Sequence, residues 1–127
     1  MERTFNPPSL LRWLKPLLFG LIPALGCAVL FTLLFTLCLT FGVPDGWIPF
    51  FAHLAVLLAA VTGGLLAGLK GREQGLLLGC ATGLALFAVH FLLMLCFGSL
   101  SLVCLTYAPA EVLGGALGGV LGVNLRK

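Results

Sequence analysis

Residues 63–75 read Gly-Gly-Leu-Leu-Ala-Gly-Leu-Lys-Gly-Arg-Glu-Gln-Gly, and this stretch decides the fold. It begins inside an apolar run rich in small residues, passes through a short turn that contains Lys70 and Arg72, and returns to apolar sequence at Gly75. An apolar run of about 20 residues is long enough for a helix to cross a hydrocarbon core of about 30 Å. The stretch therefore predicts two membrane-spanning helices that are joined by a basic turn.

The positive charges of the whole chain fall on the same predicted side as this turn. Three of the seven Lys and Arg residues precede the first apolar run, two lie in the turn, and two follow the last run. Cytoplasmic loops of membrane proteins carry this excess of positive charge. We therefore expect both termini to lie in the cytoplasm, with the chain in the bacterial cytoplasmic (inner) membrane. The residues that set this topology are Arg12, Lys15, Lys70, Arg72, Arg126 and Lys127.

The composition excludes an ordinary soluble domain. The chain is 61% hydrophobic and 9% charged, whereas soluble domains have roughly 25% charged residues. The lipid bilayer is thus the expected partner of its outer surface. The net charge of +3 does not indicate nucleic acid, because the basic residues form short clusters beside apolar runs.

We expect an all-α integral membrane bundle of four transmembrane helices. The predicted spans are 17–41, 48–69, 75–97 and 101–124, within a domain 17–124. Residues 1–16 are expected to form a cytoplasmic or interfacial segment with a short helix, and residues 125–127 a cytoplasmic basic tail. The start of the fourth helix stays open between Ser101 and Pro109, since proline is common as a first helical residue. The later start leaves only about 16 residues, too few for a full span.

Small residues recur every fourth position in each predicted helix. Membrane helices associate through close backbone contact, which small residues at this spacing permit. We expect tight packing within the bundle, and any small-residue face left over would favour a homo-oligomer. The similar Gly-Gly stretches of the second and fourth helices also raise two parallel-repeated helical hairpins as an alternative. The packing glycines are Gly63, Gly64, Gly68, Gly79, Gly83, Gly114, Gly115, Gly118, Gly119 and Gly122.

Three ionisable residues, His53, His90 and Glu111, lie within the predicted spans. At 1.5 Å per residue they lie about 24, 22 and 20 Å from the inner edge, and each projects onto the small-residue face of its helix. Polar groups at such positions are functional candidates. One reading is a proton-responsive or ion-binding cluster, and a second is a structural hydrogen bond between helices. A third applies if the fourth helix starts at Pro109, because Glu111 would then be a first-turn acid.

No catalytic constellation accompanies these residues. The sequence has no nucleophile–base pair, phosphate-binding loop or metal-ligand set, and none of its five cysteines forms a CxxC motif. We therefore expect neither an enzyme nor a metal or cofactor site. A disulfide that involves Cys96 and Cys104 is an open alternative.

The Gly-Gly stretch of 63–75, together with Gly118-Gly-Val-Leu-Gly-Val-Asn-Leu125, resembles a known family. The chain is similar to the uncharacterised small four-helix bacterial membrane proteins of the YrzE type, over the second to fourth helices. This resemblance implies the topology and the membrane, and no mechanism.

Two functions compete. The first is a structural or accessory membrane protein that acts through glycine-mediated packing, either with itself or within a larger membrane complex. The alternative is a small oligomeric proton- or ion-coupled transporter or channel, which uses the His/Glu cluster in the outer half of the membrane.

Overall fold

The computed structural model describes residues 7–71, 74–98, 102 and 104–126, with side chains from Leu14 onward except that of Cys104. These residues form α1 (Pro7–Thr40), the short 3-10 helix η1 (Asp45–Trp47), α2 (Ile48–Lys70), α3 (Gly75–Cys96) and α4 (Cys104–Arg126). Each of the four α-helices is long and apolar enough to cross a membrane. The predicted all-α class with four spans is confirmed.

The first helix starts earlier than predicted. We expected a separate interfacial segment before Leu17, but α1 is continuous from Pro7 and contains Pro16 and Pro23. Proline is well placed in a first turn, and inside a membrane helix neighbouring groups satisfy the carbonyl that it frees. The 34 residues of α1 extend about 51 Å. This exceeds the hydrocarbon thickness of about 30 Å, so α1 is longer than an upright crossing of the membrane requires.

The fourth helix settles the question of its start. It begins at Cys104 and contains Pro109, so the alternative start at Pro109 is wrong. The preferred start at Ser101 falls outside the described residues. With 23 residues, α4 extends about 34 Å and can cross the membrane. It also runs through Leu125 and Arg126, which we had placed in the tail.

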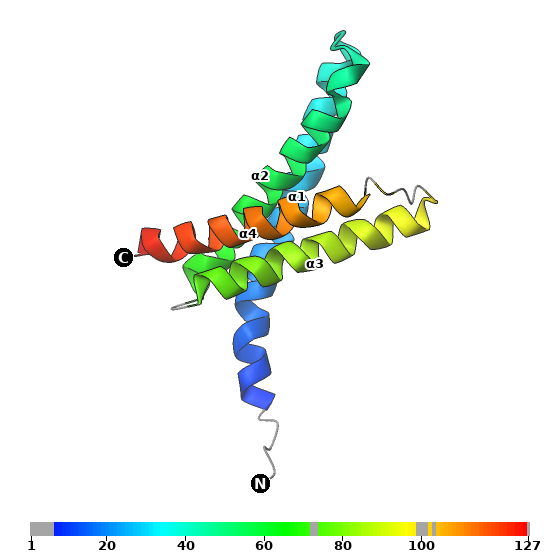
Figure 1. Cartoon of the computed structure of the whole chain (residues 1–127). Coiled ribbons are helices and arrows are strands. Elements are labelled where there is room, and N and C mark those ends of the chain that lie inside the picture. The colour runs from blue at the N-terminus through cyan, green and yellow to red at the C-terminus, as the bar shows by residue number, and fades with distance from the viewer. Residues whose placement is uncertain (1–6, 72–73, 99–101, 103, 127) are drawn as a thin grey trace.

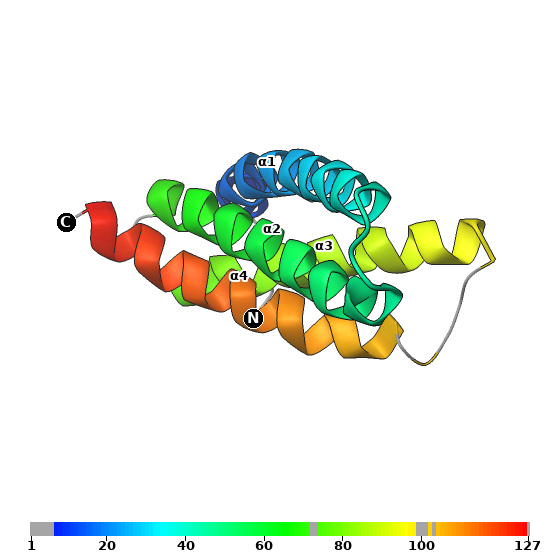
Figure 2. The same cartoon turned by 90° about the horizontal axis from the view of Figure 1, so that it is seen from above.

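The helices pack unequally. The most extensive contacts of α4 are with α2 and α3, while α1 packs on α2 and, less extensively, on α3. Figure 1 shows α1 running steeply across α3 and α4. Figure 2, seen from above, shows α1 on the opposite side of α2 from α4. This leaves α1 as the helix that the rest of the bundle covers least.

Two glycines of α4, Gly115 and Gly119, are in close contact with both α2 and α3. A Cβ added to Gly64 of α2 or to Gly79 of α3 would lie 2.9 Å from the carbonyl carbon of Gly115. One turn along, a Cβ added to Gly68 or Gly75 would lie 3.0 Å from the carbonyl carbon of Gly119. These approaches are too close for any side chain. Three helices therefore meet backbone to backbone along α4, which fixes how α3 and α4 face each other.

The C-terminal ends of α1 and α3 close in the same way. Gly42 (φ +100°) and Gly98 (φ +67°) follow the two helices in the left-handed region, which glycine adopts without strain. Each glycine comes after a phenylalanine, Phe41 and Phe97. The matching Phe-Gly endings thus share a structural role. The proposed duplication of the two hairpins stays a prediction.

Candidate functional site

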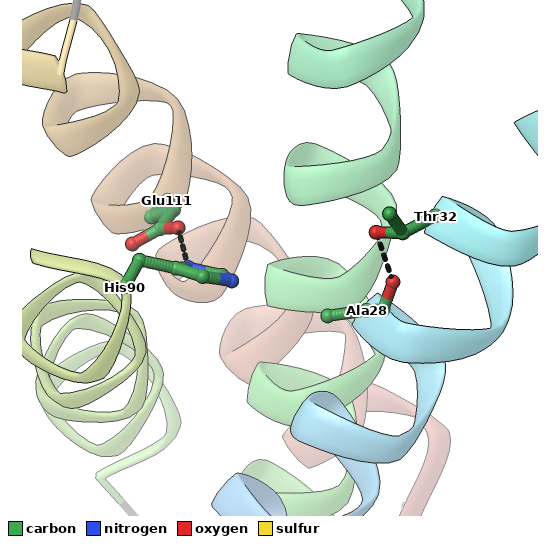
Figure 3. A network of polar contacts seen from close by, with 4 residues as sticks. All are labelled: Ala28, Thr32, His90 and Glu111. Atoms are coloured by element: carbon green, nitrogen blue, oxygen red, sulfur yellow. Dashed lines mark hydrogen bonds and ion pairs between the residues drawn. The ribbon is translucent and has the colours of Figure 1, made fainter. Parts of the chain in front are cut away.

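The candidate site is formed where α3 and α4 come closest. A Cβ added to Gly83 would lie 2.9 Å from the carbonyl carbon of Glu111, so the two backbones are in contact there. His90 follows Gly83 by about two turns of α3 and reaches across to α4. Its Nδ1 lies 2.5 Å from Oε1 of Glu111. Figure 3 shows this pair, with Thr32 of α1 on the facing side.

The carboxyl group of Glu111 is fully enclosed. The side chain of Glu111 is 0% exposed and that of His90 is 22% exposed. Oε1 is held by His90, whereas no group among the described residues forms a hydrogen bond with Oε2. A buried polar atom without a partner has lost its hydration and costs about 1–3 kcal/mol or more. Such an atom in a membrane helix is a functional candidate.

The hydrogen bond between the two residues can exist in more than one protonation state. When Glu111 is ionised, Nδ1–H of His90 donates to the carboxylate. When Glu111 is protonated, its hydroxyl can donate to a deprotonated Nδ1. The pair can therefore hold one proton between its two members and take up a second without losing the contact.

Both residues line a cavity of about 280 Å³ in the half of the bundle that lies away from Lys70 and Arg126. All four α-helices contribute to its wall, which is mainly apolar. Aromatic rings of α1, α2 and α4 are part of the wall, together with two threonines of α1. The side chains that matter for its chemistry are Thr32, Phe35, Thr36, Phe51, His90, Tyr107 and Glu111.

The third predicted residue, His53, lies beside a different part of α4. Its Nδ1 is 2.7 Å from the carbonyl oxygen of Pro49, and its Nε2 is 3.0 Å from Oγ1 of Thr106. Its ring stacks on Tyr107 with the centroids 4.4 Å apart. None of these contacts joins His53 to Glu111, so the structure pairs His90 with Glu111 and separates His53 from them.

The division follows from the two-sided contact of α4. Thr106 and Glu111 are five residues apart, which places them about 140° apart around the helix. Thr106 therefore faces α2 and His53, while Glu111 faces α3 and His90. The depths estimated from the sequence place these three residues at a similar level in the membrane. They do not show which neighbouring helix each side chain faces. Because Glu111 lies in the third turn of α4, the hypothesis that it is a first-turn acid of a helix starting at Pro109 is wrong.

Sequence reasoning missed the aromatic wall of the cavity. Phe35 and Phe51 resemble any lipid-facing apolar residue in the sequence, but their ring centroids lie 5.0 Å apart at the cavity. Tyr107 was the one available signal, since the hydroxyl of a tyrosine in an apolar helix needs a polar partner.

The basic residues gather at the other end of the bundle. Nζ of Lys70 lies 4.0 Å from the ring centroid of Phe19, and Nη1 of Arg126 donates to the carbonyl oxygen of Leu69 at 3.1 Å. The ends of α2 and α4 thus carry their charges side by side. Lys15 is exposed on α1. Arg72, Lys127 and the side chain of Arg12 lie outside the description.

Among the described residues, no group of three or more His, Cys, Asp and Glu is placed to share a metal ion. Cys27, Cys38, Cys80 and Cys96 are free thiols. The side chain of Cys104 lies outside the described residues, and the structure shows Cys96 without a disulfide, so the alternative of a bridge at Cys96 finds no support.

Comparison with known protein families finds a match. A family model described as "protein of unknown function (DUF3792)" matches residues 13–122. No curated protein matches the chain, and no solved structure does. The match covers α2 and α3 and most of α1 and α4, and it includes His53, His90 and Glu111.

Proposed function

This chain belongs to the DUF3792 family of proteins of unknown function, and we propose that it is a small proton-linked cation carrier of the bacterial cytoplasmic membrane. The sequence stretch around the turn 70–74 supports a narrower place among proteins of the YrzE type. The carrier site is the His90–Glu111 pair. A proton and a cation bind there in turn, so that one positive charge replaces another at the same carboxyl group.

The observation that carries this proposal is the burial of Glu111 together with its incomplete hydrogen bonding. Its side chain is fully buried, one oxygen is held by His90, and the other has no partner among the described residues. A helix-packing contact alone would be better served by satisfying both oxygens or by an apolar residue. A carboxyl group kept half-paired beside a cavity suits a site that exchanges ligands.

The proposed orientation places both termini in the cytoplasm. It is supported by the confinement of all seven Lys and Arg residues to one predicted side. The contacts of Lys70 with Phe19 and of Arg126 with Leu69 are in agreement, because they group the basic ends of α2 and α4. The cavity then lies in the outer half of the membrane.

Flux across liposomes tests this function. Purified protein is reconstituted with a pH-sensitive dye inside, and Na⁺, K⁺ or benzyltrimethylammonium is added outside in turn. We expect at least one of these cations to drive proton efflux in the wild type, and Glu111→Gln to abolish it. Asp45→Asn is the matched control, since it removes an exposed carboxylate from η1. No proton movement with any cation, in folded and oriented protein, would contradict the proposal.

A structural or accessory role is the second candidate, and α1 favours it. A Cβ added to Gly26 meets no atom within 4 Å, and Ile22, Val29 and Leu33 on the same face are 67%, 61% and 63% exposed. This face fits a second copy of the chain. Gly26 was not among the predicted packing glycines, and those glycines do not form such a face, because Cβ atoms added to them meet neighbouring helices within the bundle.

The second candidate has its own test. Gly26→Leu should lower the dimer fraction measured by cross-linking in lipid while leaving the thermal stability of the monomer unchanged. A wild-type protein that is monomeric in lipid would contradict it.

A further inference from the structure

We infer that the cavity binds a singly charged organic ammonium ion with an aromatic or branched apolar substituent. This ligand class rests on the proposed function, because it names the cation that exchanges with the proton on Glu111. It goes further in excluding small inorganic ions as the preferred ligand.

The charge of the wall fits one positive charge. Among the described residues that form the cavity wall, Glu111 is the only acidic one, and none is a Lys or Arg. Oε1 of Glu111 is paired with His90, whereas the buried Oε2 has no hydrogen-bond partner among the described residues, so half of the carboxyl group is not satisfied by the protein. The titratable groups of the wall are His90 of α3 and Tyr107 and Glu111 of α4, and the parts of α1 and α2 in the wall contribute none. A divalent ion would therefore remain uncompensated.

The aromatic side chains fit an organic cation. Phe35, Phe51 and Tyr107 bring rings from three helices to the cavity. A cation within about 6 Å of a ring centroid is attracted by the negative face of the ring, and the attraction grows when the site excludes water. Rings combined with a carboxylate are the usual recognition chemistry for substituted ammonium groups.

The same wall suits a small inorganic ion poorly. Such ions need several oxygen ligands in place of the water that they lose. The hydroxyl of Thr32 donates to the carbonyl oxygen of Ala28 at 2.7 Å, and that of Thr36 donates to the carbonyl oxygen of Thr32 at 2.8 Å. Both threonines thus turn back toward their own helix. The remaining wall offers mainly carbon atoms. These atoms cannot take the place of the water molecules that an inorganic ion loses when it binds.

The size of the cavity restricts the ligand further. A volume of about 280 Å³ lies at the lower end of ligand sites, which range from about 300 to 1,000 Å³. One substituted ammonium group with a single ring fits this volume. Benzyltrimethylammonium is therefore the probe of choice.

Equilibrium dialysis of radiolabelled benzyltrimethylammonium against the full chain in detergent tests the inference. We expect saturable binding that Glu111→Gln weakens more than about thirtyfold, since a buried partner of the charge is lost. Phe51→Leu should weaken it by about three- to thirtyfold, through loss of the ring face. Phe51→Leu keeps an apolar side chain of similar size, so the test survives if Glu111→Gln fails to fold.

Two matched controls separate the site from general effects. Phe50→Leu removes an exposed ring that neighbours Phe51 but does not line the cavity, and it should leave binding unchanged. Asp45→Asn should do the same for a carboxylate outside the cavity. Neopentylbenzene, the neutral carbon counterpart of the probe, should compete much more weakly than unlabelled benzyltrimethylammonium.

The outcomes also separate this inference from the proposed function. Proton flux that depends on Glu111 with Na⁺ or K⁺, in protein that does not bind benzyltrimethylammonium, overturns the ligand class and leaves the carrier function standing. Binding that depends on Glu111 and Phe51 without any proton flux supports the ligand class and overturns the carrier function. Equal binding by Phe51→Leu and Phe50→Leu overturns the aromatic part of the site.

Discussion

Gly64 of α2 and Gly79 of α3 meet the same carbonyl group, that of Gly115 on α4, and a Cβ on either would lie 2.9 Å from its carbon atom. Backbone contact on both sides leaves α4 no freedom to move away from one neighbour without striking the other. This places Glu111, one turn before Gly115, in a fixed position against α3. The glycines are thus the support of the candidate site.

Substituting one of these glycines should damage the bundle. Gly79→Val places a branched side chain against the backbone of Gly115, and we expect a loss of at least about 1–3 kcal/mol of stability. Gly26→Val is the matched control, because its added atoms meet open space on the same kind of helix. Thermal unfolding of the two variants in detergent checks this. Equal midpoints for the two variants would mean that the close contact has no energetic role.

The hydrogen bond between His90 and Glu111 should be measurable as a coupling energy. We expect Glu111→Gln to lower stability modestly, because the amide keeps only part of the interaction. The losses of stability caused by His90→Leu and by Glu111→Leu should add up to more than the loss in the double variant, since each single change leaves a buried group without its partner. A double-mutant cycle should give a coupling of about 0.6–2 kcal/mol. A coupling energy of zero, with Glu111→Gln as stable as wild type, would show that the hydrogen bond between His90 and Glu111 does not stabilise the bundle.

His53 should be separable from the site. His53→Phe keeps a ring against Tyr107 and removes both hydrogen bonds of the imidazole. Since neither bond reaches Glu111, binding of benzyltrimethylammonium should be unchanged while stability falls. A large loss of binding in folded His53→Phe protein would show that His53 acts together with the His90–Glu111 pair.

Cysteine labelling tests the orientation. In a variant without native cysteines, Asp45→Cys should react with a membrane-impermeant maleimide added to intact spheroplasts. Lys70→Cys should react only after the membrane is opened, because the basic ends of α2 and α4 are predicted to be cytoplasmic. The reverse pattern would invert the topology and move the cavity to the inner half of the membrane.

The sequence predicted the parts of this fold that depend on hydrophobic length and small-residue spacing. The helices after residue 48 end within three residues of the predicted bounds, because Gly, Pro and charged turns mark them. The extent of α1 was not predictable in the same way. Pro16 normally ends a helix in water, but in the structure α1 runs through it.

The candidate site was predictable only in part. His90 and Glu111 were identified as polar residues on packed faces, and the structure brings them together. The separate place of His53 depends on which side of α4 each neighbour occupies, and no single-helix projection contains that information. Phe35 and Phe51 carry no signal in the sequence, since their role arises only from the meeting of α1 and α2.

The most direct test of the central claim is the number of protons released when the cation binds. Benzyltrimethylammonium is added to purified protein in weakly buffered detergent solution, and the pH is followed with a soluble dye. Exchange at a single carboxyl group predicts about one proton released per cation bound at a pH where the site is proton-loaded. It predicts none in Glu111→Gln, and an unchanged value in Asp45→Asn. Saturable binding without proton release at any pH between 5.5 and 8 would contradict the exchange on Glu111.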